Sequence, residues 1–302
     1  MAKRRKGRNV HGILLLNKPT GLTSNEILQK VKGLYNANKA GHTGSLDPLA
    51  TGLLPLCLGE ATKISHFLLD ADKHYIAECH LGATTTTADS EGDILQERPI
   101  DGIDAAQIEQ VIQQFIGEQM QMPPMYSALK HQGQPLYKLA RKGQTVEREA
   151  RPITIFDISI IDISLPKISI HVHCSKGTYI RTLAEDIGEA LGCGAHISAL
   201  HRSEVGHYKD MLDFETLQET ATQGFEALDA LLIPIDSALP HLPALYLSEE
   251  LTFYIRQGQA VQVSQAPTEG WVKLLTAEQE FIGLGQILDD GRIAPKRLMN
   301  LA

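Results

Sequence analysis

The stretch from residue 41 to residue 52, GHTGSLDPLATG, contains a single carboxylate, Asp47, within a glycine-rich sequence. Pro48 disfavours helical geometry at the preceding residue and therefore favours an extended conformation at Asp47. Gly41 and Gly44 permit backbone conformations and close approaches that other residues resist. This pattern is typical of a loop that presents one carboxylate to a reacting group. Aspartate before proline is also a common helix start, and these twelve residues alone favour that capping interpretation.

Motifs for other chemistries are weak or absent. The loop lacks the Gly-Lys-Ser/Thr sequence of a P-loop, and no GxGxxG motif follows a predicted strand. A catalytic triad of His42, Ser45 and Asp47 would require three side chains within six residues to converge from one turn. The chain also has no GxSxG nucleophile elbow. Hydrolysis by an activated serine is therefore disfavoured.

Metal binding is disfavoured by the pattern around the histidines. Side chains alternate between the two faces of a strand, so His171 and His173 share one face and Cys174 lies on the other. We therefore expect surface histidines, a core cysteine and no metal site. The four cysteines are scattered without a CxxC pair, which is typical of free thiols in a reducing compartment.

Four further residues can complete a site around Asp47. Tyr75 and Tyr179 stand at the starts of a predicted strand and a predicted helix, where an aromatic ring can face a ligand. Each residue also has a structural alternative: packing at the core edge for the tyrosines, a surface ion pair for Arg181 and a core strand position for Leu200. Together, a carboxylate, a guanidinium that can orient it and aromatics that can stack on a flat ring describe a pocket for an extruded base.

Composition indicates a globular protein with local basic segments. The 302 residues are 43% hydrophobic and 21% charged, and no stretch approaches the length of a membrane span. The net charge of −8 argues weakly against a nucleic-acid partner, but five of the 28 basic residues fall within residues 1–9. Residues 130–151 hold six Lys or Arg against two Glu. A polyanion can be bound by these two segments, although charge alone favours a solvated loop and a flexible tail.

Helix and strand patterns alternate along most of the chain. Thr23 and Glu26 form a capping box, which predicts a helix from there to about Tyr35. Residues 122–150 contain three prolines, which predicts a long exposed excursion from the domain. The proline-rich residues 234–246 predict a domain boundary. The other predicted strands are residues 12–16, LLPLCL (53–58), HYIAECHL (74–81), two strands within 153–174, and ISALHRSEVGHY (197–208). The other predicted helices are EATKISHFLLDADK (60–73), residues 105–115, and the helix within KGTYIRTLAEDIGEALG (176–192), which follows a turn and has Ile180 on its buried side.

Three long motifs resemble one family. GHTGSLDPLATGLLPLCLGEATK, with LLLNKPTGLTS before it and KGTYIRTLAEDIGEALGCGAH after it, is similar to the TruB family of bacterial tRNA pseudouridine-55 synthases. The resemblance runs from about residue 12 to the C-terminus and includes MYSALKHQG and REARPITIF. It implies an isomerase that flips a uridine out of the tRNA T-loop and converts it to pseudouridine without a cofactor. It leaves open whether the aspartate attacks the base, attacks the sugar or promotes elimination.

The resemblance also implies roles for individual residues. Asp47 matches the catalytic aspartate, a nucleophile, and Arg181 matches the arginine that orients it. Tyr75 matches the tyrosine that stacks on the uracil and is a candidate for proton transfer. The family commonly has an acidic residue where this chain has Thr86, whereas Asp89 in the same segment is retained. The remaining residues expected to bind the substrate are His42, Tyr179 and Leu200.

RNA binding is expected to extend beyond the pocket. The basic composition of residues 1–9 predicts a flexible tail. The resemblance implies a catalytic domain in residues 10–240, with an RNA-gripping insertion at about 122–150, and a PUA-like RNA-binding domain in residues 241–302. The basic residues expected to contact the RNA backbone are Lys18, Lys63, Lys130, Arg141 and Lys142.

The expected fold class is α+β. A central mixed, mainly antiparallel sheet with flanking helices should carry the cleft, followed by the small β-rich C-terminal domain. The expected partner is the tRNA T-stem-loop, with no membrane and no obligate protein partner, and the expected form is a cytoplasmic monomer. A hypothesis of a different class is a non-catalytic tRNA-binding or folding module, and assistance to tRNA folding can also accompany catalysis.

Overall fold

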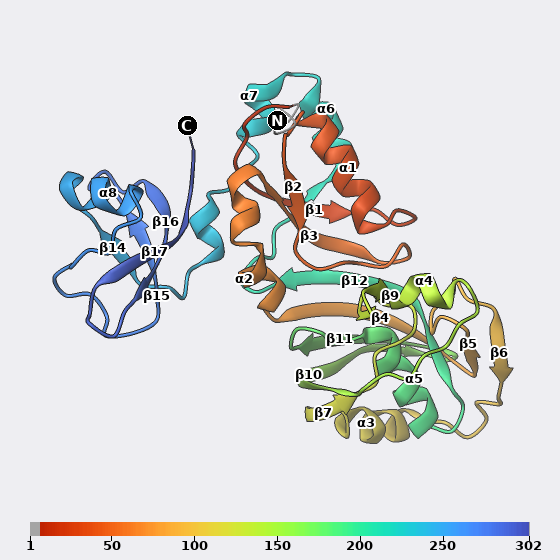
Figure 1. Ribbon diagram of the computed structural model, residues 1–302. Coiled ribbons are helices and arrows are strands. Elements are labelled where there is room, and N and C mark those ends of the chain that lie inside the picture. Colours follow the sequence, from red (N-terminus) through yellow and green to blue (C-terminus); the bar gives the residue numbers. More distant parts are fainter. Residues whose placement is uncertain (1–6, 302) are drawn as a thin grey trace.

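A nine-stranded sheet forms the centre of the larger part of the chain in the computed structural model, which describes residues 7–301 (Figure 1). The strand order is β13-β1-β3-β12-β4-β11-β10-β7, with β2 paired to β3. The β1–β13 and β3–β12 pairs are parallel and the other neighbours antiparallel, which confirms the expected mixed, mainly antiparallel sheet. The strands are β1 (Gly12–Lys18), β2 (Ala40–His42), β3 (Thr51–Leu58), β4 (Lys73–Leu81), β7 (Gly117–Gln121), β10 (Arg151–Ser164), β11 (Lys167–Cys174), β12 (Ala195–Val205) and β13 (Leu212–Asp213).

Helices α1 (Ser24–Leu34), α3 (Ala105–Gln113) and α5 (Ile180–Ala190) bury their apolar residues in one core with the sheet. The predicted capping box is present at the start of α1, where the Thr23 side chain accepts from Glu26 N and the Glu26 side chain accepts from Thr23 N. The predicted alternation of β11 is also confirmed, because Ile168, Ile170 and Val172 are fully buried. These helices and strands fix the frame that holds the Asp47 loop.

A second, four-stranded sheet lies at the C-terminal end of the chain (Figure 1). Phe281 and Leu284 of this sheet pack with Ile13 and Leu53, which lie outside the core shared by α1, α3 and α5. The two parts of the chain therefore share a buried apolar contact. The elements of the C-terminal part are β14 (Ala244–Tyr246), α8 (Glu249–Arg256), β15 (Trp271–Leu275), β16 (Phe281–Ile287) and β17 (Ile293–Leu298).

Residues 122–150 form an exposed excursion with little regular structure, as expected. It contains only two short paired strands and a one-turn helix. One predicted helix is wrong in part: residues 60–73 break at Ile64 into two short helices, so no continuous helix spans them. The remaining short elements are β5 (Ala83–Thr85), β6 (Ile94–Glu97), β8 (Lys130–His131), β9 (Gln134–Pro135), α4 (Leu136–Ala140), η1 (Gly59–Lys63), α2 (Ser65–Asp70), α6 (Phe214–Ala221), α7 (Phe225–Asp229) and η2 (Ile235–Ala238).

The predicted flexible tail of residues 1–9 is wrong at its C-terminal end. Arg8 forms a 2.5 Å ion pair with Asp229 and its guanidinium lies 4.0 Å from the centre of the Phe225 ring. The backbone of Arg8 also donates to Asn36 O. Residues 1–6 of the predicted tail lie outside the described residues. Within residues 7–301, no helix is both long enough and apolar enough to cross a membrane.

Candidate active site

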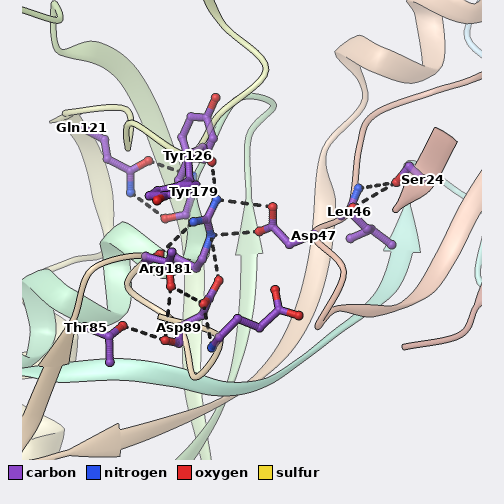
Figure 2. A network of polar contacts seen from close by, with 11 residues as sticks. Ser24, Leu46, Asp47, Thr85, Asp89, Gln121, Tyr126, Tyr179 and Arg181 are labelled. Atoms are coloured by element: carbon purple, nitrogen blue, oxygen red, sulfur yellow. Dashed lines mark hydrogen bonds and ion pairs between the residues drawn. The ribbon is translucent and has the colours of Figure 1, made fainter. Parts of the chain in front are cut away.

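Asp47 lies on an irregular loop between β2 and β3, and no helix begins at Pro48. The capping interpretation of Asp47 is therefore wrong. The loop is fixed on the side of α1 by the buried Ser24 hydroxyl, which accepts from Leu46 N at 2.7 Å and donates to Leu46 O at 3.1 Å (Figure 2). Because Leu46 is the neighbour of Asp47, these bonds fix the backbone just before the carboxylate.

Lys18 fixes the loop on its other side. Its side chain is fully buried, and Nζ donates to the carbonyl oxygens of Pro19, Pro48 and Ala50 at 2.8, 3.3 and 2.7 Å. Burial lowers the pKa of Lys18 to about 8, although Asp47 opposes the shift. The prediction that Lys18 contacts the RNA backbone is wrong, because its ammonium is enclosed and already bound to loop carbonyls.

Arg181 lies in the first turn of α5, beside the Asp47 carboxylate (Figure 2). Its Nε lies 2.9 Å from one Asp47 oxygen, and Nη2 donates to the other at 3.4 Å. Nη1 also donates to Thr87 O at 2.8 Å and Nη2 to Tyr126 O at 2.7 Å. Only 4% of Arg181 is exposed. The alternative of a surface ion pair is therefore excluded, and the guanidinium is held rigidly enough to aim Asp47.

A second carboxylate, Asp89, lies 3.8 Å from Arg181 Nε (Figure 2). It is only 3% exposed, and it accepts from the backbone N–H of Glu91 at 3.1 Å and from the Thr87 hydroxyl. The sequence pattern alone did not predict that Asp89 lies next to Arg181. Its retention in the TxTxD segment was the only signal. One buried guanidinium therefore lies between two carboxylates, of which Asp47 is the accessible one, with 39% of its side chain exposed.

Although part of its side chain faces the cavity, the protein around Asp47 removes much of the solvation of its charge and so raises its pKa above the ordinary value. Arg181 opposes this rise through its charge and its hydrogen bond, Asp89 adds to it, and Lys18 opposes it. The net effect is a carboxylate that is more basic than a solvated aspartate. Such a group is suited to act as a nucleophile or to stabilise positive charge at short range.

The carboxylate opens onto a cavity of about 480 Å³. The structure places all six residues predicted for the pocket around this cavity: His42, Asp47, Tyr75, Tyr179, Arg181 and Leu200. The backbone of Tyr179 is fixed by Gln121, whose Oε1 accepts from Tyr179 N at 2.8 Å and whose Nε2 donates to Tyr179 O at 3.0 Å (Figure 2). Tyr75 and Leu200 are each 8% exposed, so together they form a largely apolar wall.

His42 belongs to the same cavity but not to a catalytic triad. Its Nδ1 is buried and has no hydrogen-bond partner among the described residues. Burial and the charge of Arg202 lower its pKa. The imidazole therefore presents a neutral ring edge and face to whatever enters the cavity.

The predicted RNA backbone contacts lie apart from the cavity. Lys130, Arg141 and Lys142 are exposed on the 122–150 excursion. Lys63 instead donates to Leu298 O at 2.6 Å and pairs with Glu60, so its ammonium is bound at the contact with the C-terminal sheet. Glu60 also accepts from Asn300 N at 2.8 Å at the same contact.

The family was identified by comparison with known proteins. Residues 32–180 match the family described as "TruB family pseudouridylate synthase (N terminal domain)". Residues 181–240 match "tRNA pseudouridylate synthase B C-terminal domain", and residues 243–299 match "Pseudouridine synthase II TruB, C-terminal". The chain belongs to the TruB family.

Relatives within the TruB family match nearly the whole chain. A tRNA pseudouridine synthase B of Nitrosococcus oceani is 54% identical over 299 residues, which cover 98% of this chain and 97% of the relative. One of Coxiella burnetii is 54% identical over 295 residues, covering 97% and 96%. A chain of the "Crystal Structure of a Cbf5-Nop10-Gar1 Complex" superposes with a TM-score of 0.73 at 28% identity, covering 96% of this chain and 85% of that chain.

Proposed function

We propose that this TruB family member isomerises uridine to pseudouridine at position 55 of the tRNA T-loop. The observation that carries this proposal is the Asp47–Arg181 pair at the edge of a cavity walled by Tyr75, Tyr179 and Leu200. A flat pyrimidine fits such a wall by stacking, and the oriented carboxylate then lies where the sugar enters.

The reaction breaks the N1–C1′ bond of uridine, turns the base and forms a C5–C1′ bond. The proton on C5 leaves and N1 gains one, so atoms and charge balance. Neither redox change nor transfer to a second molecule occurs, and the chemistry therefore requires no cofactor. Asp47 acts as nucleophile or as the stabiliser of positive character at C1′. Arg181 keeps the carboxylate aimed through both of its oxygens.

Tyr75 has two roles in this proposal. Its ring stacks on the uracil, which holds the detached base in the cavity while it turns. Burial raises the pKa of its hydroxyl, although Arg202 opposes that shift. The hydroxyl therefore stays protonated and can donate a hydrogen bond or relay a proton near the base.

The rest of the chain supplies RNA binding in this proposal. Lys130, Arg141 and Lys142 contact phosphates from the 122–150 insertion, and residues 241–302 form a PUA-like domain that binds the same tRNA. The exposure of the three basic side chains and the separate C-terminal sheet support this division. The chain works on tRNA in the cytoplasm as a monomer, without an obligate protein partner.

Mapping pseudouridine in an unmodified tRNA transcript tests the proposal. Incubation with the purified chain alone should convert the uridine at position 55 and leave the other uridines unchanged. A transcript with cytidine at position 55 is the matched control and should yield no pseudouridine. Binding of tRNA without any conversion would instead favour the non-catalytic module, and faster refolding of misfolded tRNA would assign a separate folding role.

A further inference from the structure

Arg202 is the largest fully buried side chain of the described residues, at 1% exposure. It lies on β12, where it pairs with Gly52 of β3 on one side and with Tyr75 of β4 on the other. Residues directly opposite each other in an antiparallel pair share a face, so the guanidinium lies on the same side of the sheet as the Tyr75 ring. Both residues line the cavity that contains Asp47.

Among the residues that the structure describes, Arg202 has no carboxylate partner. No ion pair joins it to an acidic side chain within residues 7–301. Its hydrogen bonds go to two backbone carbonyls, from Nε to Leu53 O at 2.7 Å and from Nη2 to Gly44 O at 3.3 Å. A buried cation bound only to neutral groups is costly, so its position in a cavity indicates an anion that arrives during function.

Neighbouring groups respond to this uncompensated charge. Burial lowers the pKa of Lys73 to about 8, and Arg202 is the next largest cause. Lys73 is itself 6% exposed and donates to Leu69 O at 2.7 Å and to Ala71 O. Lys73 and Arg202 therefore make the cavity lining near Tyr75 positive. The two carboxylates of the site, Asp47 and Asp89, lie beside Arg181 instead.

The proposed isomerisation generates an anion on the base. When the N1–C1′ bond breaks, its electron pair stays with N1 and spreads over the ring carbonyl oxygens of the uracil. The anion then turns, C5 bonds to C1′, and the C5 proton leaves as N1 is protonated. The detached base is therefore negative while it lies against Tyr75. A buried cation beside that ring stabilises it strongly, because the surroundings screen charge poorly.

We propose that Arg202 is a catalytic residue that stabilises the detached uracil anion and retains it in the cavity until C5 reaches C1′. This role rests on the proposed function. The two arginines of the site then have different roles: Arg181 orients Asp47, and Arg202 stabilises the detached base.

The test compares two substrates in single-turnover reactions with enzyme in excess. One T-stem-loop carries uridine at the target position and the other carries 5-fluorouridine. Fluorine makes the detached base a weaker base, so its departure needs less help from a cation. Uridine and pseudouridine have the same mass, and the fluorinated base has no C5 proton to lose after the C5–C1′ bond forms. The rate is therefore followed for both substrates as the loss of the N1-linked nucleoside, separated by chromatography after nuclease digestion. Arg202→Gln is the main variant, and Arg202→Met serves if the glutamine variant fails to fold.

The control is Ser24→Ala, which loosens the Asp47 loop through Leu46 without changing charge near the base. Arg202→Gln should slow the uridine substrate by about 10²-fold or more. It should slow the fluorinated substrate by a clearly smaller factor, with RNA affinity near that of the parent. Ser24→Ala should slow both substrates by the same factor, since it affects only the position of Asp47.

Three results would overturn the assignment. Equal slowing of both substrates by Arg202→Gln would show that Arg202 only holds the Gly44 and Leu53 carbonyls. Weaker RNA binding with an unchanged rate in the bound complex would make it a phosphate contact. A parent protein that forms no pseudouridine from uridine would refute the proposed function first, and the role of Arg202 with it.

Discussion

Replacing Arg181 with methionine removes a guanidinium that contacts both Asp47 and Asp89. The side chains of Arg181 and Asp89 are 5% and 4% exposed, so water cannot replace the lost contacts. Removing one partner of a buried ion pair typically costs about 3–5 kcal/mol of unfolding free energy. We expect Arg181→Met to lose stability in this range, measured by denaturant unfolding.

The matched control is Arg98→Met. Arg98 pairs with Glu189 at 2.8 Å, but the two side chains are 25% and 52% exposed. Such a pair is worth about 0–1 kcal/mol, so the control should unfold almost like the parent. Catalysis should separate the variants further, because misplacing a catalytic group by about 1 Å can cost 10²-fold in rate. Equal loss of stability in the two variants would refute the reasoning about burial.

Three further predictions follow from the site. Lys18→Met should lose about 1–3 kcal/mol of unfolding free energy, measured in denaturant, because it leaves loop carbonyls at Pro48 and Ala50 without a buried donor. The pKa of Asp47 is higher in the folded protein than in the unfolded chain, because burial raises it. Ionising Asp47 therefore lowers the free energy of unfolding, and this loss is absent below the unfolded pKa of about 3.9. The stability of Asp47→Asn relative to the parent should therefore increase as pH rises from about 4 to 7, measured by thermal unfolding across pH. The triple substitution Lys130→Gln, Arg141→Gln and Lys142→Gln should flatten the salt dependence of tRNA binding by about 0.9 in slope per lost phosphate contact, and an unchanged slope would contradict it.

Local patterns in the sequence predicted most of the elements. The capping box at Thr23 and the alternation of Ile168, Ile170 and Val172 depend on neighbours in the chain, so periodicity suffices to find them. The break at Ile64 was missed because the segment around it has a continuous helical composition. Tertiary contacts override such local preference.

The site was only partly visible in the sequence because its decisive contacts join distant segments. Asp47 and Arg181 are 134 residues apart, and their pairing was expected from family resemblance rather than from spacing. Lys18 was misread as an RNA contact, since nothing local shows that its ammonium turns inward to the Asp47 loop. Arg202 was missed for the same reason: only the strand register places it opposite Tyr75.

The most direct test of the account is the single-turnover yield of pseudouridine by Asp47→Asn on unmodified tRNA. Asparagine keeps the shape of the side chain and removes its charge, so the variant should bind tRNA nearly as the parent does. We predict no pseudouridine at position 55 on the timescale in which the parent completes the reaction. Pseudouridine formation by the purified variant at a rate near that of the parent would contradict the central role of Asp47.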